Sequence, residues 1–413
     1  MRRGRRSRRL EGLAGFHEDV LKEILVRLPA KSVLRCRAVC REWRRLTTDP
    51  IFLVVYHAHQ PTLPLISSFR TTEDDASDRL RLDAIHLQRA ELRPPVFMPR
   101  WWYPVDASCD GLVIINGYYI CNLATHQLAP LVPSEGVEID NLVGLYRHQP
   151  SGEYRVLFWT QSDIPSERYC LNDYCVLTVG SKKPRRITCS FSQIDNEMEL
   201  ISGMGPYIHG APVHLHGNLH VHWKKRWDVH YHRILVFDTV AELLRQMRPP
   251  AVNPQHTMQL FDMGGKLAAS CSTDAFVAMR IFALEDYESQ IWSFQYRIKL
   301  PEMEIRRFQE QGNWSAKIVS GECDLLISCF GWLLQCDRNG KLLAKFQYDG
   351  DLPVVIPHAL KESLIQHSFF QKKRKDCVCV LDGLHQTSSS TSVGRSRRPK
   401  KPNPRVFGDE WVN

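Results

Sequence analysis

The chain has 413 residues, of which 43% are hydrophobic and 24% charged, and its formal net charge at pH 7 is +9. These values are those of a soluble protein with room for two domains and a large hydrophobic core. No apolar run approaches the roughly 18 residues of a membrane-spanning helix, and acidic residues interrupt the first twenty positions. Neither a membrane span nor a secretory signal is therefore expected.

The positive charge lies at the two ends of the chain. Residues 1–9 contain six arginines and no acidic residue, and residues 370–413 contain ten Lys or Arg against four Asp or Glu. Both ends are predicted to be disordered, because they have too few apolar residues for a core. Their basic runs are typical either of nuclear-import signals or of solvated tails. A nucleic-acid-binding fold would carry such charge on its folded surface, so nucleic acid is not an expected partner.

The thirteen cysteines are an odd number and are scattered along the chain, several of them within apolar segments. This distribution favours free thiols in a reducing compartment over a disulfide framework. Cys377 and Cys379 are too isolated to suggest a metal site.

Residues 18–28 are predicted to form a helix with one broad apolar face. Pro29 is expected to end this helix, because proline has no backbone N–H to continue its hydrogen bonding. A second short helix is expected from residue 31, and a third through Trp43 and Leu46 to residues 48–50. A unit of about forty residues is near the lower limit for independent folding. Its apolar faces either dock on the rest of the chain or bind a partner, and periodicity leaves both possibilities open.

The stretch from Phe16 to Phe52 resembles the F-box, the adaptor-binding module of SKP–cullin–F-box ubiquitin ligases. The matching pieces are Glu18-Asp19, Glu23-Ile24-Leu25, Arg27-Leu28-Pro29, Lys31-Ser32-Val33, Cys40-Arg41-Glu42-Trp43 and Asp49-Pro50-Ile51-Phe52. His17 stands where the plant form of the family has proline. The resemblance implies that this stretch binds an SKP-type adaptor and, through it, a cullin scaffold. The residues expected to contact the adaptor are Phe16, Val20, Leu21, Ile24, Leu25, Leu28, Pro29, Ser32, Leu34, Val39 and Trp43.

From about residue 96 to residue 358 the pattern changes to short apolar or alternating runs separated by Gly, Asn, Asp and Pro, which is typical of an all-β domain. Turn residues recur at intervals of 58, 58, 48 and 51 residues, at Asn122, Gly180, Asp238, Asp286 and Asp337. Propeller blades repeat at roughly 50 residues, so five or six blades are expected. A pair of β-sandwiches is the structural alternative.

This second region is similar to the F-box-associated domain of plant F-box proteins. The similar pieces, in order, are 108–112 (SCDGL), 121–125 (CNLAT), 144–146 (GLY), 153–156 (EYRV), 217–220 (GNLH), 234–238 (ILVFD), 264–267 (GGKL) and 284–292. Leu123 stands where that family usually has proline.

Few motifs suggest chemistry. Histidines cluster between residues 209 and 232, four of them in the stretch VHLHGNLHVHW. With Gly217-Asn218 as a two-residue turn, which this dipeptide favours, His214 and His216 would share one face and His220 and His222 the other. A three-residue turn at 217–219 would place all four on one face. No metal site and no cofactor is predicted, since no phosphate loop, nucleophile elbow or zinc-protease motif occurs.

Two other features, Cys40 and the aromatic run at 101–103, each have a functional and a structural interpretation. Arginines near Cys40 could lower the pKa of its thiol, but its position in the F-box favours a packing role. Trp101, Trp102 and Tyr103 could line a binding surface or pack within a blade.

The expected fold class is therefore α+β, with a three-helix F-box followed by a propeller-like β domain. The expected boundaries are a basic tail at 1–12, an F-box at 13–57, a linker at 58–95, the β domain at 96–358 and a second basic tail at 359–413. The expected function is that of a non-catalytic substrate-recognition subunit, in which the β domain holds a protein substrate in its loops or central pore. The alternative is a nuclear regulatory protein that acts outside a ligase, and the expected location is the nucleus, the cytoplasm or both.

Overall fold

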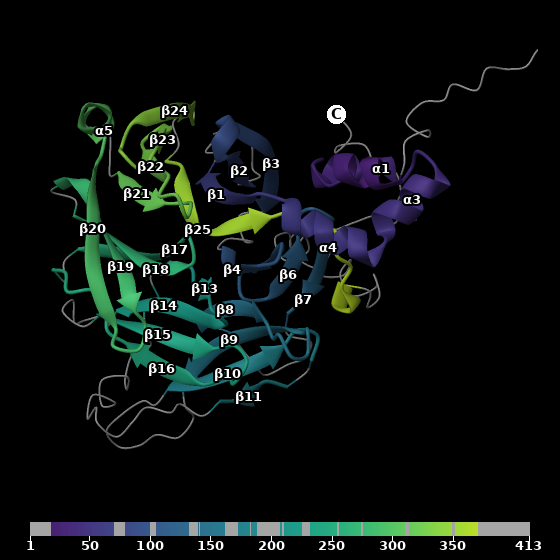
Figure 1. The fold of residues 1–413 in the computed structure, drawn as a ribbon, viewed down its shortest axis with the longest axis horizontal. Helices are drawn as coiled ribbons and strands as arrows, with labels where there is room; N and C mark the ends of the chain where they lie inside the picture. The colour runs from purple at the N-terminus through teal and green to yellow at the C-terminus, as the bar shows by residue number, and fades with distance from the viewer. Residues whose placement is uncertain are drawn as a thin grey trace, which may run out of the picture. The chain divides into compact units, whose positions relative to one another are not determined.

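The computed structural model describes residues 18–69, 79–99, 105–131, 139, 141–161, 172–181, 183–187, 207–208, 210–224, 232–253, 256–273, 276–309, 314–348 and 352–370. An N-terminal helical region is followed by a six-bladed β-propeller (Figure 1). None of the helices in these ranges has the length and apolar character needed to cross a membrane.

The helical region contains α1 (Glu18–Leu25), α2 (Ala30–Cys36), α3 (Arg41–Thr48) and α4 (Pro50–His59). The first three match the predicted helices, but α4 was not predicted. It begins because Oδ1 of Asp49 accepts hydrogen bonds from the backbone N–H groups of Ile51 and Phe52, at 2.9 and 3.0 Å. Pro50 occupies its first turn, where a missing N–H costs nothing.

Six antiparallel sheets form the blades. Blade 1 is β25 (Val354–Lys361), β1 (Thr62–Phe69), β2 (Arg79–His86) and β3 (Glu91–Pro99), and blade 2 is β4 (Val105–Cys109), β5 (Leu112–Ile115), β6 (Tyr119–Asn122) and β7 (Gln127–Pro130). Blade 3 is β8 (Asn141–Arg147), β9 (Tyr154–Gln161), β10 (Asn172–Thr178) and β11 (Arg185–Arg186). Blade 4 is β12 (Tyr207–Ile208), β13 (Val213–Leu215), β14 (Asn218–Lys224), β15 (His232–Asp238) and β16 (Leu244–Met247). Blade 5 is β17 (Thr257–Met263), β18 (Lys266–Thr273), β19 (Phe276–Asp286) and β20 (Ile291–Lys299), and blade 6 is β21 (Ser315–Ile318), β22 (Leu325–Cys329), β23 (Trp332–Cys336) and β24 (Leu342–Gln347).

Blade 1 joins the two ends of the β domain. Its innermost strand, β25, pairs antiparallel with β1, for example at Leu63 and Leu360. The expected linker at 58–95 is therefore wrong, because residues 62–69, 79–86 and 91–99 are strands. The partner of β1 lies at the far end of the sequence, so no local hairpin signal marks it. The β domain also extends to residue 361, beyond the expected end at 358, and the basic tail expected at 359–413 is wrong for residues 359–370, where the last strand, the buried Leu364 and a short 3-10 helix at residues 368–370 are ordered.

The predicted repeat is a repeat of turns between the third and fourth strands of a blade. Asn122, Asp238, Asp286 and Asp337 each follow a third strand, and each Oδ1 accepts two backbone N–H groups of the next turn at 2.8–3.2 Å. Gly180, with φ +86°, lies at the same place in blade 3. Blades 2 to 6 thus each use one side-chain-capped or glycine turn at this place, which explains the intervals of about 50 residues.

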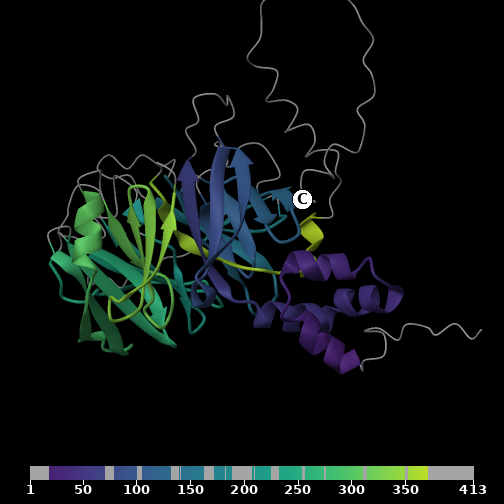
Figure 2. The same cartoon turned by 90° about the horizontal axis from the view of Figure 1, so that it is seen from above.

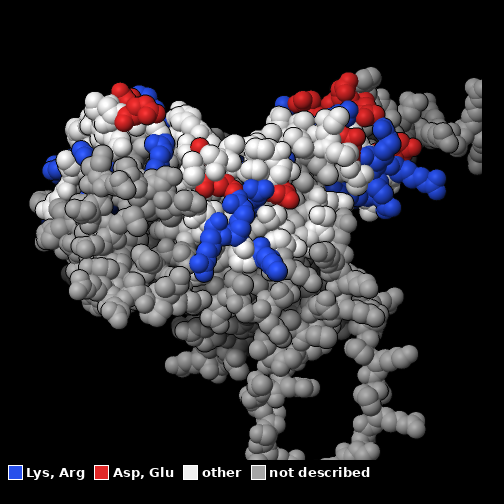
Figure 3. Space-filling view, turned by 90° about the horizontal axis from the view of Figure 1, so that it is seen from below, with Lys and Arg blue, Asp and Glu red and all other residues white. Residues whose placement is uncertain are grey.

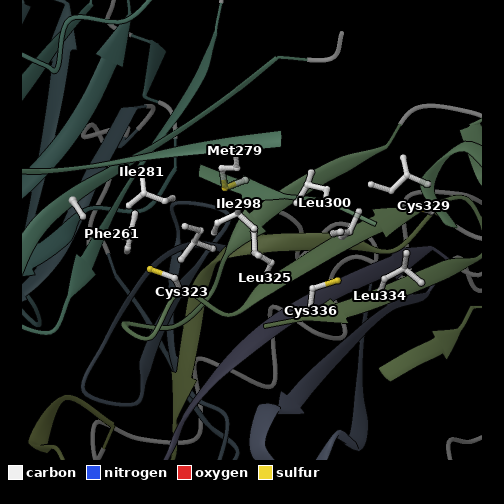
Figure 4. Packing of buried hydrophobic residues seen from close by; sticks show 14 residues of the cluster. Phe261, Met279, Ile281, Ile298, Leu300, Cys323, Leu325, Cys329, Leu334 and Cys336 are labelled. Carbon is white, nitrogen blue, oxygen red and sulfur yellow. The ribbon is translucent and has the colours of Figure 1, made fainter. Parts of the chain in front are cut away.

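The hydrophobic core is divided into clusters that lie between neighbouring blades. Figure 4 shows the cluster between blades 5 and 6, in which Met279 and Ile281 of β19 pack against Leu325 of β22 and Leu334 of β23. A short helix, α5 (Glu302–Gln309), joins these two blades and adds the buried Ile305 to the cluster. Burial on both faces of each blade accounts for the near-continuous apolar runs in the sequence.

Candidate functional site

The residues expected to contact a partner divide into three groups in the structure. Phe16 lies outside the described residues. Leu21 and Leu25 are buried, and Leu28, Ser32, Leu34 and Trp43 are half-buried. Val20, Ile24, Pro29 and Val39 are exposed. The ten described residues therefore do not form one continuous surface, because Leu21 and Leu25 support the helices from beneath.

Exposed apolar side chains lie on α1, in the α2–α3 turn and on α4, and we refer to them together as the exposed apolar surface. Val20 and Ile24 lie one turn apart on α1, and Val39 is 65% exposed. Ile51, Val54 and Val55 are also exposed, and their spacing places them on one face of α4. Sequence reasoning missed these three residues because it ended the helical region at Pro50. The Asp49-Pro50 pair is itself a helix-start signal and could have revealed them.

Beneath this surface lies a compact core. Leu25, Ala30, Val33 and Tyr56 are its most buried members from the helices, and Leu364, near the end of the described chain, is only 1% exposed within the same cluster. The Tyr56 hydroxyl donates to the carbonyl of Leu28 at 3.1 Å. Burial raises the pKa of Tyr56, so this hydroxyl stays protonated and can act as a donor.

Charged side chains also lie on the helical region, at the right of Figure 3. Glu18 of α1 accepts a hydrogen bond from Arg45 of α3 at 2.8 Å and pairs with Lys22 at 3.2 Å. The hydrogen bond from Arg45 is the main cause of the lowered pKa of Glu18. Cys40 Sγ accepts from the backbone N–H of Trp43 at 3.4 Å, so this thiol caps α3 and has the structural role expected from its position.

The helices contact blades 1 and 2, beside which they lie in Figure 2. Glu362, directly after β25, accepts a hydrogen bond from the backbone N–H of Ala30 at 2.8 Å and pairs with Arg93 of β3 at 2.6 Å. Its carbonyl oxygen lies 3.1 Å from Nδ1 of His57 on α4. One residue therefore links α2, α4 and the outer strand of blade 1.

A second link passes through the turn between β4 and β5. Asp110 lies 3.7 Å from Nε2 of His57 and accepts a hydrogen bond from Tyr154 at 3.1 Å. The hydrogen bond to His57 is the largest cause of the lowered pKa of Asp110. Gly111 has φ +84°, and a Cβ there would lie 2.5 Å from the carbonyl oxygen of Lys361. The Asp110-Gly111 pair is a turn, and it is also part of this contact.

Comparison with known proteins agrees with this arrangement. The profile of the F-box domain matches residues 14–54, and that of the F-box associated beta propeller domain matches residues 53–338. The second match covers more than half of the chain. The chain belongs to the F-box proteins with an F-box-associated propeller. Members of this family generally act as substrate adaptors of SKP–cullin–F-box ligases and are typically non-catalytic.

Several Arabidopsis thaliana F-box proteins are similar to this one. At1g47790 is 41% identical over 316 residues, which cover 70% of this chain and 73% of the relative. At4g21240 is 26% identical over 67% of this chain and 66% of the relative, so the chain spans about two thirds of that protein. Among solved structures, the periplasmic gluconolactonase PpgL of Pseudomonas aeruginosa aligns with a TM-score of 0.35 at 13% identity. That alignment covers 72% of this chain and 100% of the enzyme, and the likeness is too distant to support an argument.

The histidine cluster of this F-box protein has a different register from the one predicted. Leu215 pairs with Asn218, so the turn is His216-Gly217, one residue earlier than expected. Both turn residues have positive φ, of +50° and +73°, as a two-residue turn of this kind requires. His214 pairs with Leu219 and lies on the opposite face from His220 and His222. Within the described ranges, no group of three or more His, Cys, Asp or Glu is arranged to hold a metal.

His220 instead joins two blades. Its ring is buried, with Nδ1 3.2 Å from the carbonyl oxygen of Val213 and Nε2 2.7 Å from the hydroxyl of Tyr287 in blade 5. Burial lowers the pKa of His220 to about 4, so the imidazole is neutral at physiological pH. A neutral ring can accept from one partner and donate to the other, which suits a packing role.

Around the propeller axis, polar side chains bond to the inner strand of the neighbouring blade. Gln259 of β17 donates to the carbonyl of Ile318 at 2.9 Å, and Lys317 of β21 donates to that of Val355 at 2.7 Å. His358 of β25 bonds to the backbone of Asp106 in β4. These contacts satisfy backbone groups that the inner edge of each blade would otherwise leave unpaired.

Other features singled out in the sequence lie outside the described residues. They are the Trp101-Trp102-Tyr103 cluster, His209, His230, His17, residues 1–12 and 371–413 of the two expected basic tails, and with them Cys377 and Cys379.

Proposed function

We propose that this F-box protein is the substrate-recognition subunit of an SKP–cullin–F-box ubiquitin ligase, with no bond chemistry of its own. Its contribution would be proximity, because tethering a substrate beside the transfer enzyme raises the effective concentration of the reacting groups. The observation that carries the proposal is the exposed apolar surface of a helical module that otherwise has a complete core. Exposed apolar groups of this kind on a folded unit indicate a binding surface.

The proposed adaptor contact centres on Val20, Ile24 and Val39, with the half-buried Leu34 and Trp43 at its margins. Leu21 and Leu25 would act only by holding α1 in place. The outer face of α4, with Ile51 and Val54, extends the apolar surface beyond the residues expected from the sequence. Ion pairs such as Glu18–Arg45 would set orientation and association rate more than affinity.

The substrate would bind at the end of the propeller opposite the helices. The helical region meets Asp110, in a turn between first and second strands, and Ala124, in a turn between third and fourth strands. Because the strands are antiparallel, turns between second and third strands lie at the other end. Two of these turns carry exposed aromatic side chains, Tyr118 between β5 and β6 and Phe330 between β22 and β23. Aromatic residues often anchor protein interfaces, which favours this end as the substrate surface.

The adaptor proposal is tested by purifying the full chain together with an SKP-type adaptor. Wild type is expected to co-purify, and the double variant Val20→Asp, Ile24→Asp is expected to weaken binding at least about 100-fold, because two charges would be buried at the interface. Val240→Asp, an exposed valine of the propeller, is the matched control. The proposal fails if wild type does not bind the adaptor or if the double variant binds as well as wild type.

The substrate surface needs a separate test. We expect that ligase complexes containing Tyr118→Ser or Phe330→Ser no longer ubiquitinate the proteins that the wild-type complex ubiquitinates, whereas both variants still bind the adaptor as wild type does. Retention of the same ubiquitinated proteins by both variants would exclude this end of the propeller. We also propose that the protein works in the nucleus, the cytoplasm or both, on the strength of the basic sequences at its two ends.

A further inference from the structure

The core of the F-box is completed by residues from the opposite end of the chain. We call residues 362–365, which follow the last propeller strand, the clasp. Leu364 is 1% exposed and packs in one cluster with Leu21, Leu25 and Val33 of the F-box, and Ile365 packs against the same cluster. The F-box therefore lacks a complete hydrophobic core when the clasp is absent.

The clasp also caps α2. Pro29 precedes this helix and supplies no side-chain cap. Instead, Oε2 of Glu362 accepts the hydrogen bond from the Ala30 N–H, across 332 residues of sequence, and lies 3.3 Å from the Tyr56 hydroxyl. The Glu362 carboxylate is 14% exposed, and Arg93 partly neutralises its charge. A carboxylate at a helix N-terminus is favourable both as an acceptor and through the helix dipole.

The propeller holds the clasp from its other side. The side chain of Asn122 donates to the carbonyl of Ser363 at 3.0 Å, and Gly111 gives Ser363 room to pass. Beyond the clasp, Phe369 and Phe370 of the short helix η5 (Ser368–Phe370) pack on the cluster between blades 2 and 3. His367 stacks on Phe369 and meets the ring of Tyr154 edge-on, with ring centroids 5.0 and 5.2 Å apart. The segment is thus anchored on both sides of Leu364.

We propose that the clasp is a working part of the adaptor-binding module, with Glu362 and Leu364 as positioning residues. They order α1–α4 from beneath, so that the F-box presents its exposed surface only when the end of the propeller is in place. The role in adaptor binding rests on the proposed function, but the dependence of F-box order on the clasp does not. The two can therefore be tested separately.

The first measurement is hydrogen–deuterium exchange on the full-length protein. Leu364→Ala is expected to speed exchange of the amides of α1–α4 at least about 30-fold, because it removes a fully buried side chain from a small core. Glu362→Ala is expected to speed exchange at the start of α2 about tenfold, and Glu362→Gln less, since an amide oxygen still accepts the hydrogen bond. Amides of blade 5 should be unchanged in all three variants, as should all amides in the controls Leu343→Ala and Glu288→Ala, whose side chains are exposed.

The second measurement is the affinity of the same proteins for the SKP-type adaptor. Leu364→Ala is expected to weaken binding at least tenfold without touching the exposed surface. The clasp proposal is overturned if α1–α4 exchange as slowly in Leu364→Ala and Glu362→Ala as in wild type. If Leu364→Ala also speeds exchange in blade 5, its effect is not confined to the F-box. The exchange of α1–α4 in Glu362→Ala then decides the test, because that substitution leaves the hydrophobic core intact. Failure of wild type to bind the adaptor would overturn the proposed function, whereas the exchange result would still decide the role of the clasp.

Discussion

Tyr146 donates a 2.6 Å hydrogen bond to the carboxylate of Glu242, which lies 96 residues away in the next blade. Glu242 is 7% exposed and also pairs with Arg155 at 2.7 Å and with Arg185. The carboxylate lies in a turn of blade 4. It thus binds the inner, second and outer strands of blade 3 through Tyr146, Arg155 and Arg185. Polar bridges of this kind, together with His220–Tyr287, fix each blade against the next.

Removing this bridge should loosen blades 3 and 4. Glu242→Ala is expected to lower the free energy of unfolding by about 2 kcal/mol, because it leaves the buried Tyr146 hydroxyl and the Arg155 guanidinium without their partner. Urea unfolding followed by tryptophan fluorescence measures the change. Glu153→Ala is the control, since exposed Glu153 also pairs with Arg155, and it should cost less than about 0.5 kcal/mol. If Glu242→Ala and Glu153→Ala lowered the free energy of unfolding equally, burial of the Glu242 bridge would add nothing to stability.

Neighbouring residues of α1 should separate folding from binding. Leu25→Ala is expected to destabilise the helical region by about 2–5 kcal/mol, since Leu25 is 1% exposed. Ile24→Ala, 43% exposed, should leave stability within about 0.5 kcal/mol of wild type but weaken adaptor binding. Circular dichroism and adaptor titration together test this pair. Loss of helix stability in Ile24→Ala would mean that the exposed face is needed for folding.

Acid should destabilise the propeller at an unusually high pH. Burial lowers the pKa of His220, His358 and His367 to about 4, whereas an unfolded histidine titrates near pH 6.5. The unfolded chain therefore takes up these protons first, and stability present above pH 6.5 is lost as the pH falls toward 4. Each such histidine contributes about 1.4 kcal/mol per pH unit within this window. Asp106 acts in the opposite direction, because burial raises its pKa to about 6 and the folded state binds its proton more readily.

The measurement is the free energy of unfolding at several values between pH 7.5 and pH 4.5. His220→Gln should reduce the steepness of the decline by about one proton, and the exposed, non-titrating control Leu343→Ala should leave the slope unchanged. An unchanged slope in His220→Gln would contradict the neutral, buried state of this ring.

Two glycines should differ in their tolerance of a side chain. Gly111→Ala is expected to cost about 3 kcal/mol, because its φ is +84° and the new Cβ would press on Lys361 and Ser363. Gly264→Ala also has positive φ, but no atom lies within 4 Å of its added Cβ, so about 1 kcal/mol is expected. Thermal unfolding compares them. A Gly111→Ala protein as stable as Gly264→Ala would mean that the clasp segment shifts freely.

Much of the architecture could be predicted from local signals. The apolar spacing of residues 18–28 gave the first helix, and the turn residues Asn122, Asp238, Asp286 and Asp337 gave the blade period because each caps a turn through its own side chain. The capping of α4 by Asp49 is equally local, because the adjacent Asp49 and Pro50 are themselves a helix-start signal.

The remaining features depend on contacts distant in sequence. The pairing of β1 with β25 and the packing of Leu364 beneath α1 follow from closure of a ring, and no pattern near either residue encodes them. The His216-Gly217 turn shows a different limit: the Gly-Asn dipeptide favours a turn one residue later, and both turns leave Val213 and Leu215 on the same face, so the apolar pattern does not distinguish them. Burial also separates Ile24 from Leu25, which helical periodicity places on one broad face.

The closure of blade 1 also sets an order of events during synthesis. β1 ends at Phe69 and β25 begins at Val354, so at translation rates of about 5–20 residues per second the ribosome needs roughly 15–60 s to supply the missing strand. Throughout that interval the edge of β1 and the hollow that Leu364 fills stay open, and both are surfaces that chaperones recognise. A chain released by premature termination would close neither. The F-box is translated first, yet under the clasp proposal it becomes competent last, so that only chains that extend through the clasp could enter a ligase.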